Sequence, residues 1–134
     1  MSENNPYSER RKRQRFVASR DGNPCFWVAI DGERSPLIDL SLEGFSIAGE
    51  PQPPRCFAFE LRLTDIPDRI RGEAQMVNFV PGAAGGQIGC RFVSFQGDGA
   101  ADLKEWLTAH VIAGASVRIT AKEAEAIVQG PSLI

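Results

Sequence analysis

A short run of cationic side chains near the amino terminus has the composition of an anion-binding segment. Five of the six positions from Arg10 to Arg15 are Arg or Lys, and Arg11 and Arg15 are spaced R-x-x-x-R. A guanidinium group is a planar fork that donates paired hydrogen bonds to phosphate oxygens or to the O6 and N7 atoms of guanine. Taken alone, such a run is also explained as a solvated charge cluster. We call residues 10–15 the arm.

A second group of polar residues follows some two dozen positions later. Asp39, Ser41 and Gly44 form the pattern D-x-S-x-x-G. A carboxylate accepts hydrogen bonds, so Asp39 could take the N1–H and N2–H of guanine, while the Ser41 hydroxyl can donate or accept. Gly44 removes a side chain where a base or another backbone must come close. An Asx or Ser turn that ends in a left-handed glycine explains the same residues without a ligand.

The two groups have complementary chemistry. The arm offers donors for phosphate, and the D-x-S-x-x-G stretch offers acceptors for a base edge. A ligand that contains both guanine and phosphate would use every one of these groups, so we expect the two stretches to meet in the folded chain.

The charge balance restricts the kind of anion. The chain of 134 residues has a formal charge of −2, although residues 1–15 hold five Arg or Lys against two Glu, which leaves −5 for residues 16–134. Proteins that coat duplex nucleic acid usually have a basic face on the folded body, so a small anion is favoured over DNA or RNA.

The elements that must position these residues are mostly short strands. Apolar and polar residues alternate in "CFAFELRL" at 56–63, and Asp31-Gly32 after "FWVAI" at 26–30 is a hairpin signal. Similar runs occur at 36–49, where a turn near Gly44 separates two strands, and at 72–80 and 87–95. About six strands without intervening helices predict a mainly β fold, a six-stranded antiparallel barrel or a sandwich.

Helical periodicity appears only after the last of these strands. Leu103, Trp106, Leu107, His110 and Val111 share one face of a helix expected at 102–112, which we predict to pack on the barrel. His110 is interpreted as a packing histidine. The tail contains a strand-like run and then a short helix with a capping box at Thr120 and Glu123. We therefore expect a loose segment at 1–9, a domain at 10–112 and an extension at 113–134 made of a strand and a helix.

The sequence gives little support for a catalytic site or a metal-binding site. No nucleophile motif or phosphate-binding loop motif is present, and one histidine with three scattered cysteines supplies too few zinc ligands. Cys25, Cys56 and Cys90 adjoin apolar residues and are expected to be buried thiols. No apolar run is long enough to span a membrane or to resemble a secretion signal, so we expect a cytoplasmic protein without metal or cofactor.

The two polar motifs, in this order, resemble those of the PilZ family, whose domains bind the bacterial second messenger cyclic diguanylate. The family pattern is R-x-x-x-R before the first barrel strand and [D/N]-x-S-x-x-G some two to three dozen residues later. Phe16 after the second Arg, the stretch "DLSLEGFSI" and "IGCRF" at 88–92 also agree. The resemblance covers about residues 9–112.

The resemblance implies a six-stranded antiparallel barrel with a C-terminal helix and a ligand site made by both motifs. Arg11 and Arg15 would contact guanine and phosphate of cyclic diguanylate. Asp39 and Ser41 would recognise a guanine edge, and Gly44 would shape the turn.

Three further arginines are candidates in the same site. Arg10 and Arg13 would add contacts from the arm, whereas Arg91 is a weaker candidate, since pairing with a surface carboxylate would also explain it. The arm would be mobile without ligand and would wrap around it when bound.

The function implied is that of a non-catalytic bacterial receptor that passes its signal to a downstream effector protein. The first alternative is a PilZ-like adaptor that has lost ligand binding and acts through protein contacts, with 113–134 as a docking surface. The second is a nucleic-acid-binding barrel that uses the arm as a phosphate clamp, for which we find no exposed aromatic platform.

Overall fold

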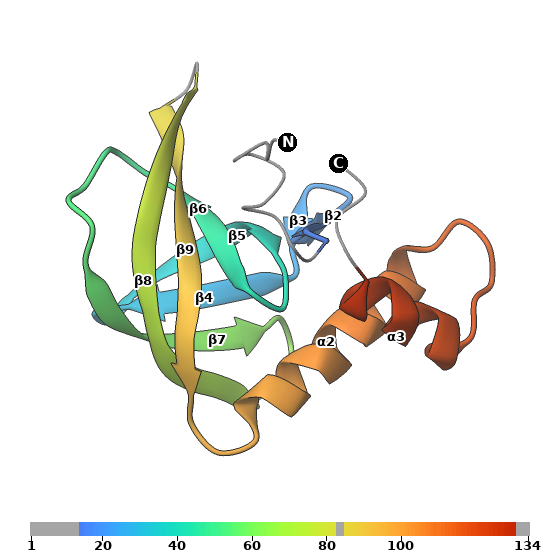
Figure 1. Ribbon diagram of the computed structural model, residues 1–134. Helices are drawn as coiled ribbons and strands as arrows, with labels where there is room; N and C mark the ends of the chain where they lie inside the picture. Colours follow the sequence, from blue (N-terminus) through green and yellow to red (C-terminus); the bar gives the residue numbers. More distant parts are fainter. Residues whose placement is uncertain (1–13, 83–84, 131–134) are drawn as a thin grey trace, which may run out of the picture.

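Six strands close into an antiparallel barrel with two helices packed beside it (Figure 1). This computed structural model describes residues 14–82 and 85–130. In the barrel the order is β5-β4-β7-β8-β9-β6, and pairing of β5 with β6 closes the ring. The strands are β4 (Phe26–Ile30), β5 (Glu33–Leu40), β6 (Gly44–Ala48), β7 (Cys56–Leu63), β8 (Arg69–Gly82) and β9 (Gly85–Phe95). The predicted six-stranded antiparallel barrel is confirmed.

Alternation of side chains builds the barrel interior. Phe26 and Val28 of β4 and Phe59 and Leu61 of β7 are all buried, and the residues between them point outward. Since successive strand residues face opposite sides, this pattern alone gives each strand one apolar face. The Asp31-Gly32 hairpin forms as expected, and both residues have positive φ, 52° and 86°, as a tight two-residue hairpin requires.

The strand β5 has partners on both edges where it carries Asp39. The short strand β1 (Phe16–Val17), which directly follows the arm, places Val17 opposite Asp39, and β6 places Ser46 opposite the same residue. The register of β5 against β6 shifts between Leu37 and Asp39. This irregularity lets both Leu37 and Leu40 point into the core while Asp39 remains partly accessible.

Two further short strands, β2 (Ser19–Arg20) and β3 (Asn23–Pro24), form a separate hairpin between β1 and β4. They lead the chain from the end of the arm segment back into the barrel. Figure 1 shows this hairpin on the side of the barrel that faces the helices.

The helix α2 (Gly99–Gly114) follows β9 and buries Leu103 and Leu107, in agreement with the predicted apolar face. The helix α3 (Ala121–Gln129) packs beside α2. The predicted capping box is present at its start, because the side chains of Thr120 and Glu123 each bond the backbone N–H of the other.

Two sequence-based predictions are wrong. Residues 115–120 form no strand; the six barrel strands are already paired with one another around the ring, and this run leads from α2 into the α3 cap. Cys56 is exposed, whereas Cys90 is buried and Cys25 is half-buried. Cys56 precedes the buried Phe57 in β7, and strand alternation therefore turns it outward.

None of the helices in the described ranges is long and apolar enough to cross a membrane.

Candidate functional site

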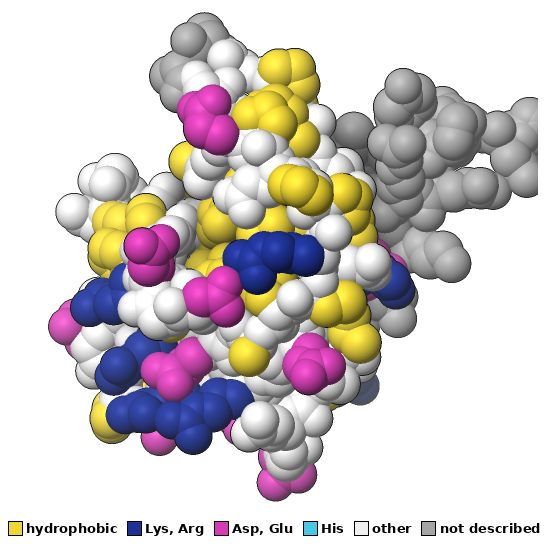
Figure 2. Space-filling view, turned by 90° about the vertical axis from the view of Figure 1, so that its left-hand side faces the viewer, with side chains coloured by type: hydrophobic (Ala, Val, Ile, Leu, Met, Phe, Trp, Pro, Cys, Tyr) yellow, Lys and Arg dark blue, Asp and Glu magenta, His cyan; other side chains and the backbone are white. Residues whose placement is uncertain are grey.

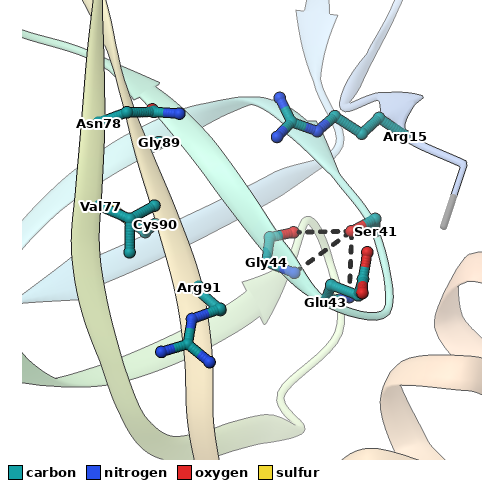
Figure 3. Close-up of a pocket in the computed structure, with 9 residues that line it drawn as sticks. All are labelled: Arg15, Ser41, Glu43, Gly44, Val77, Asn78, Gly89, Cys90 and Arg91. Atoms are coloured by element: carbon teal, nitrogen blue, oxygen red, sulfur yellow. Dashed lines mark hydrogen bonds between the residues drawn. The ribbon is translucent and has the colours of Figure 1, made fainter. Parts of the chain in front are cut away.

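A cavity of about 350 Å³ opens between the β5–β6 turn and the β8–β9 pair (Figure 3). Its volume is at the lower end of the range typical of small-molecule sites. The lining residues come from four places in the sequence: Arg15, Ser41, Glu43, Gly44, Val77, Asn78, Gly89, Cys90 and Arg91. Three of the residues predicted from the motifs, Arg15, Ser41 and Gly44, therefore meet at one cavity.

The Ser41 hydroxyl organises the turn between β5 and β6. Its Oγ accepts hydrogen bonds from the backbone N–H groups of Glu43, at 3.0 Å, and Gly44, at 3.2 Å. It also donates a longer bond of 3.4 Å to the Gly44 carbonyl. A hydroxyl has one donor and two acceptor positions, so this buried group is already satisfied. Within the described structure, Ser41 acts on the shape of the turn, and a contact with ligand would replace its longest bond.

Gly44 is required by a close backbone approach. A Cβ atom built on Gly44 would lie 2.0 Å from the carbonyl oxygen of Cys90 in β9. Gly44 does not have the positive φ expected for a left-handed turn glycine. The absence of a side chain therefore lets the turn pack directly on β9, which brings Ser41 to the cavity wall.

The two motifs meet at Arg15 and Asp39. The Arg15 Nη1 atom lies 3.9 Å from Asp39 Oδ2, and the exposed fractions of the two side chains are 36% and 20%. This distance is near the upper limit for an ion pair, and partly exposed pairs of this kind contribute little to stability. The contact holds the guanidinium at the cavity but leaves it free to exchange partners.

Asp39 also has an acceptor that no described residue satisfies. Its Oδ1 atom is buried and receives no hydrogen bond from the parts of the chain that the structure describes. A buried acceptor without a donor is costly, so an N–H group that reached Asp39 would bind favourably.

On the wall opposite the turn, the sequence analysis identified Arg91 but not Asn78. The Asn78 side chain lies over Gly89, where a Cβ atom would be 2.1 Å from Asn78 Oδ1. Figure 3 shows the amide of Asn78 pointing into the cavity toward Arg15. The register of β8 against β9 shifts between Met76 and Asn78, and such bulges redirect side chains beside binding sites. The only signal in the sequence was Asn within an otherwise regular strand.

Arg91 and Glu43 complete the polar lining. Arg91 donates a hydrogen bond of 3.1 Å to the side chain of Gln75, and among the described residues it has no carboxylate partner. Arg91 thus lies in the cavity lining, and its role as a ligand contact stays a prediction. Glu43 adds a carboxylate, so the cavity offers acceptors as well as donors. This mixture suits a ligand that has both N–H groups and anionic oxygens.

The thiol in the cavity wall is not a nucleophile. Burial raises the pKa of Cys90 to about 12, an effect that the nearby Arg55 only partly offsets, so the group remains a protonated thiol near neutral pH. In the described part of the chain no cluster of His, Cys, Asp or Glu could hold a metal ion.

Charges on the visible barrel surface are mixed. Figure 2 shows Lys and Arg side chains beside Asp and Glu rather than in one continuous basic face. Ion pairs on the barrel include Arg55 with Asp31 at 2.9 Å, and both Arg69 and Arg71 with Glu60. This arrangement does not favour a long nucleic-acid duplex.

The remaining predicted site residues, Arg10, Arg11 and Arg13, lie outside the described residues. Gln14 and Arg15 are the last part of the arm that the structure describes, and they end the arm beside the cavity.

Comparison with known proteins supports the fold. No model of a protein family matches the sequence, and no curated protein matches it. Among solved structures, the Bacillus subtilis inhibitor of motility (MotI/DgrA) is similar over 78% of this chain and 52% of its own, with a TM-score of 0.61 and 14% identity. This chain thus spans about half the length of that protein, and at such low identity the similarity concerns the fold alone.

Proposed function

We propose that this chain is a PilZ-like, non-catalytic receptor for cyclic diguanylate that signals through ordering of its arm. One observation carries the proposal. Arg15 lies 3.9 Å from Asp39, at the cavity bounded by the Ser41–Gly44 turn, although the two motifs are separated in the sequence. The shared fold with MotI/DgrA is compatible with this function.

The chemistry of the cavity explains how the ligand would bind. A phosphate of the dinucleotide accepts hydrogen bonds from Arg15, which then leaves Asp39. The freed Asp39 carboxylate, which contacts the lining residue Arg15 but is not itself part of the cavity lining, accepts the N1–H and N2–H of a guanine. Arg91 and Asn78 face the cavity from the wall opposite the turn. Bonds between Arg and phosphate oxygens contribute about 1.5–3 kcal/mol each.

The arm supplies the change of state. By resemblance, Arg11 contacts guanine and phosphate together with Arg15, and Arg10 and Arg13 add further contacts. Ordering each arm residue costs about 1–2 kcal/mol. Because this cost is similar to the gain from each charge-assisted bond, ligand would decide whether residues 10–13 are ordered, and a downstream effector protein would recognise the ordered form.

The decisive experiment is calorimetric titration of the full chain with cyclic diguanylate. We expect binding at micromolar strength or tighter, and we expect Arg15→Ala and Asp39→Ala each to abolish it. Arg15→Ala should change the free energy of unfolding by less than about 1 kcal/mol, since the pair is partly exposed. Arg69→Ala is the matched control, because it breaks the Arg69–Glu60 pair, neither member of which lines the cavity, and it should retain binding.

Three results would contradict the proposal. Wild-type protein that gives neither heat nor a thermal shift with the dinucleotide would favour the adaptor without ligand. Equal binding by the wild type and the Arg15 and Asp39 variants would place the ligand elsewhere. Oligonucleotide binding that falls steeply with salt would favour a phosphate clamp for nucleic acid.

A further inference from the structure

The segment that follows the arm is held by the barrel on one side and by a helix on the other. His110 of α2 reaches this segment with both ring nitrogens. Its Nε2 lies 2.7 Å from the carbonyl oxygen of Val17, and its Nδ1 lies 2.9 Å from Arg20 Nη2. A carbonyl only accepts and a guanidinium only donates, so these contacts require a neutral imidazole with its hydrogen on Nε2.

Val17 links this contact to the cavity. In β1 it lies opposite Asp39 of β5, and the next residue, Ala18, donates a backbone hydrogen bond of 3.0 Å to Ile38. The residue that His110 holds is therefore two positions from Arg15 and directly across from Asp39. One residue, Phe16, separates Arg15 at the cavity from Val17 at the helix contact.

A second backbone contact joins the arm to the other helix. Gln14 donates a hydrogen bond of 3.4 Å to the carbonyl oxygen of Gly130, the residue that ends α3. The Lys104–Glu125 pair, at 3.0 Å, and the buried Ala124 and Val128 of α3 fasten this helix to the rest of the molecule. A shift of the arm thus acts on both helices.

The surroundings of His110 show which charges bear on it. It shares a cavity of about 510 Å³ with Arg20 of β2, Asp21 after β2, Asp65 after β7 and Trp106 of α2. The edge of its ring also contacts Phe26 of β4, at 5.1 Å between centroids. Burial lowers the pKa of His110, the Val17 carbonyl opposes this shift, and Arg20 adds to it. The neutral form required by the contacts is therefore also the form that the surroundings favour.

We infer that His110 is a positioning residue that couples the arm to helix α2, so that ligand capture at Arg15 is transmitted to the α2–α3 pair. The inference rests on the proposed function for the identity of the ligand. When Arg15 leaves Asp39 for a phosphate, β1 changes its position on β5. The Val17 carbonyl moves with it, and the bond to His110 either draws α2 along or breaks.

His110 is the single histidine of the chain, which makes it a spectroscopic probe of this coupling. In protein labelled with ¹⁵N-histidine, we expect imidazole shifts typical of the neutral Nε2–H form at pH 7. Addition of cyclic diguanylate should move these resonances, although His110 does not line the ligand cavity. Arg15→Met without ligand should also move the titration midpoint of His110, because it loosens β1. Arg55→Met is the control and should leave the midpoint unchanged.

Hydrogen exchange supplies a second readout. Ligand should change amide exchange in α2 and α3 of the wild type, and His110→Ala should remove this change in the helices. Thr108→Ala is the matched control on the same helix, because its hydroxyl bonds only Lys104 of α2, and it should retain the change.

The outcomes separate this inference from the function that it builds on. If calorimetry shows binding while the imidazole resonances and the helix amides do not respond, the coupling is wrong and the receptor function stands. If no ligand binds, the receptor function fails, and the Arg15→Met measurement alone then decides the coupling. An unchanged His110 midpoint in that variant would overturn it.

Discussion

The two sides of the candidate cavity differ in how many contacts hold them in place. The β5–β6 turn is held by three bonds to Ser41 and by direct packing of Gly44 on the Cys90 carbonyl. The arm side is held by the Gln14–Gly130 bond, the β1–β5 pairing and the bond from His110 to Val17. Its side-chain contact with the site, Arg15–Asp39, is long and partly exposed. One side is preformed, and the other can exchange partners. The receptor function proposed above would use both, because a fixed wall gives specificity and a movable one gives a signal.

Among the substitutions that test this difference between the two sides, Gly44→Ala should cause the largest loss of stability. The added methyl group would meet a backbone carbonyl at 2.0 Å, so the turn or β9 must shift. We expect a loss of about 3 kcal/mol in the free energy of unfolding, measured by urea denaturation.

Gly114→Ala is the matched control for this change. A Cβ atom at Gly114, the last residue of α2, has no neighbour within 4 Å. This variant should be as stable as the wild type or slightly more so. If both variants unfold at the same urea concentration, the turn is not packed as tightly as proposed.

A smaller loss should follow Ser41→Ala. The change leaves the N–H groups of Glu43 and Gly44 without their acceptor, and we expect a cost of about 1–3 kcal/mol in the free energy of unfolding. Ser46→Ala sharpens the result, because Ser46 is equally buried but its Oγ has no partner in the described structure. The Ser46 variant should keep or gain stability. Equal losses in the two variants would show that the Ser41 bonds do not fix the turn.

The smallest expected effect is a pH dependence of the free energy of unfolding, which comes from His110 on the arm side. The pKa of His110 is lower in the folded protein than its ordinary value. The unfolded chain therefore binds a proton more readily, so the stability from neutral His110 is full above about pH 6.5 and is lost as the pH falls below it. Unfolding followed between pH 7.5 and 5.5 should show this decrease. The slope is a fraction of about 1.4 kcal/mol per pH unit, the value for one whole proton.

His110→Gln isolates this contribution. Glutamine keeps a donor for the Val17 carbonyl but does not titrate in this range. The stability of the variant should therefore depend less on pH than that of the wild type. An identical pH dependence in the two proteins would mean that His110 is not the group responsible.

Local patterns in the chain were enough to predict the barrel strands and the start of α3, whereas α2 extends beyond the predicted 102–112 to Gly99–Gly114. The alternation of Phe57, Phe59 and Leu61 placed β7, and the pairing of Thr120 with Glu123 placed the start of α3. These signals succeed because burial on one face and satisfaction of a helix terminus involve residues only two to four positions apart. The same patterns failed at residues 115–120, where strand character is present in the sequence but no strand forms and the run connects α2 to α3.

Contacts between distant segments depended on how the ring closes. Three such contacts join residues that are far apart in the chain. Asp39 lies between β1 and β6. Asn78 lies over Gly89, and His110 bonds the carbonyl of Val17. Such contacts follow from strand order and from bulges that shift the register by one residue, and a one-residue shift turns a side chain from one face to the other. The sequence therefore supplied the chemical groups of the site, and closure of the barrel set which of them face one another.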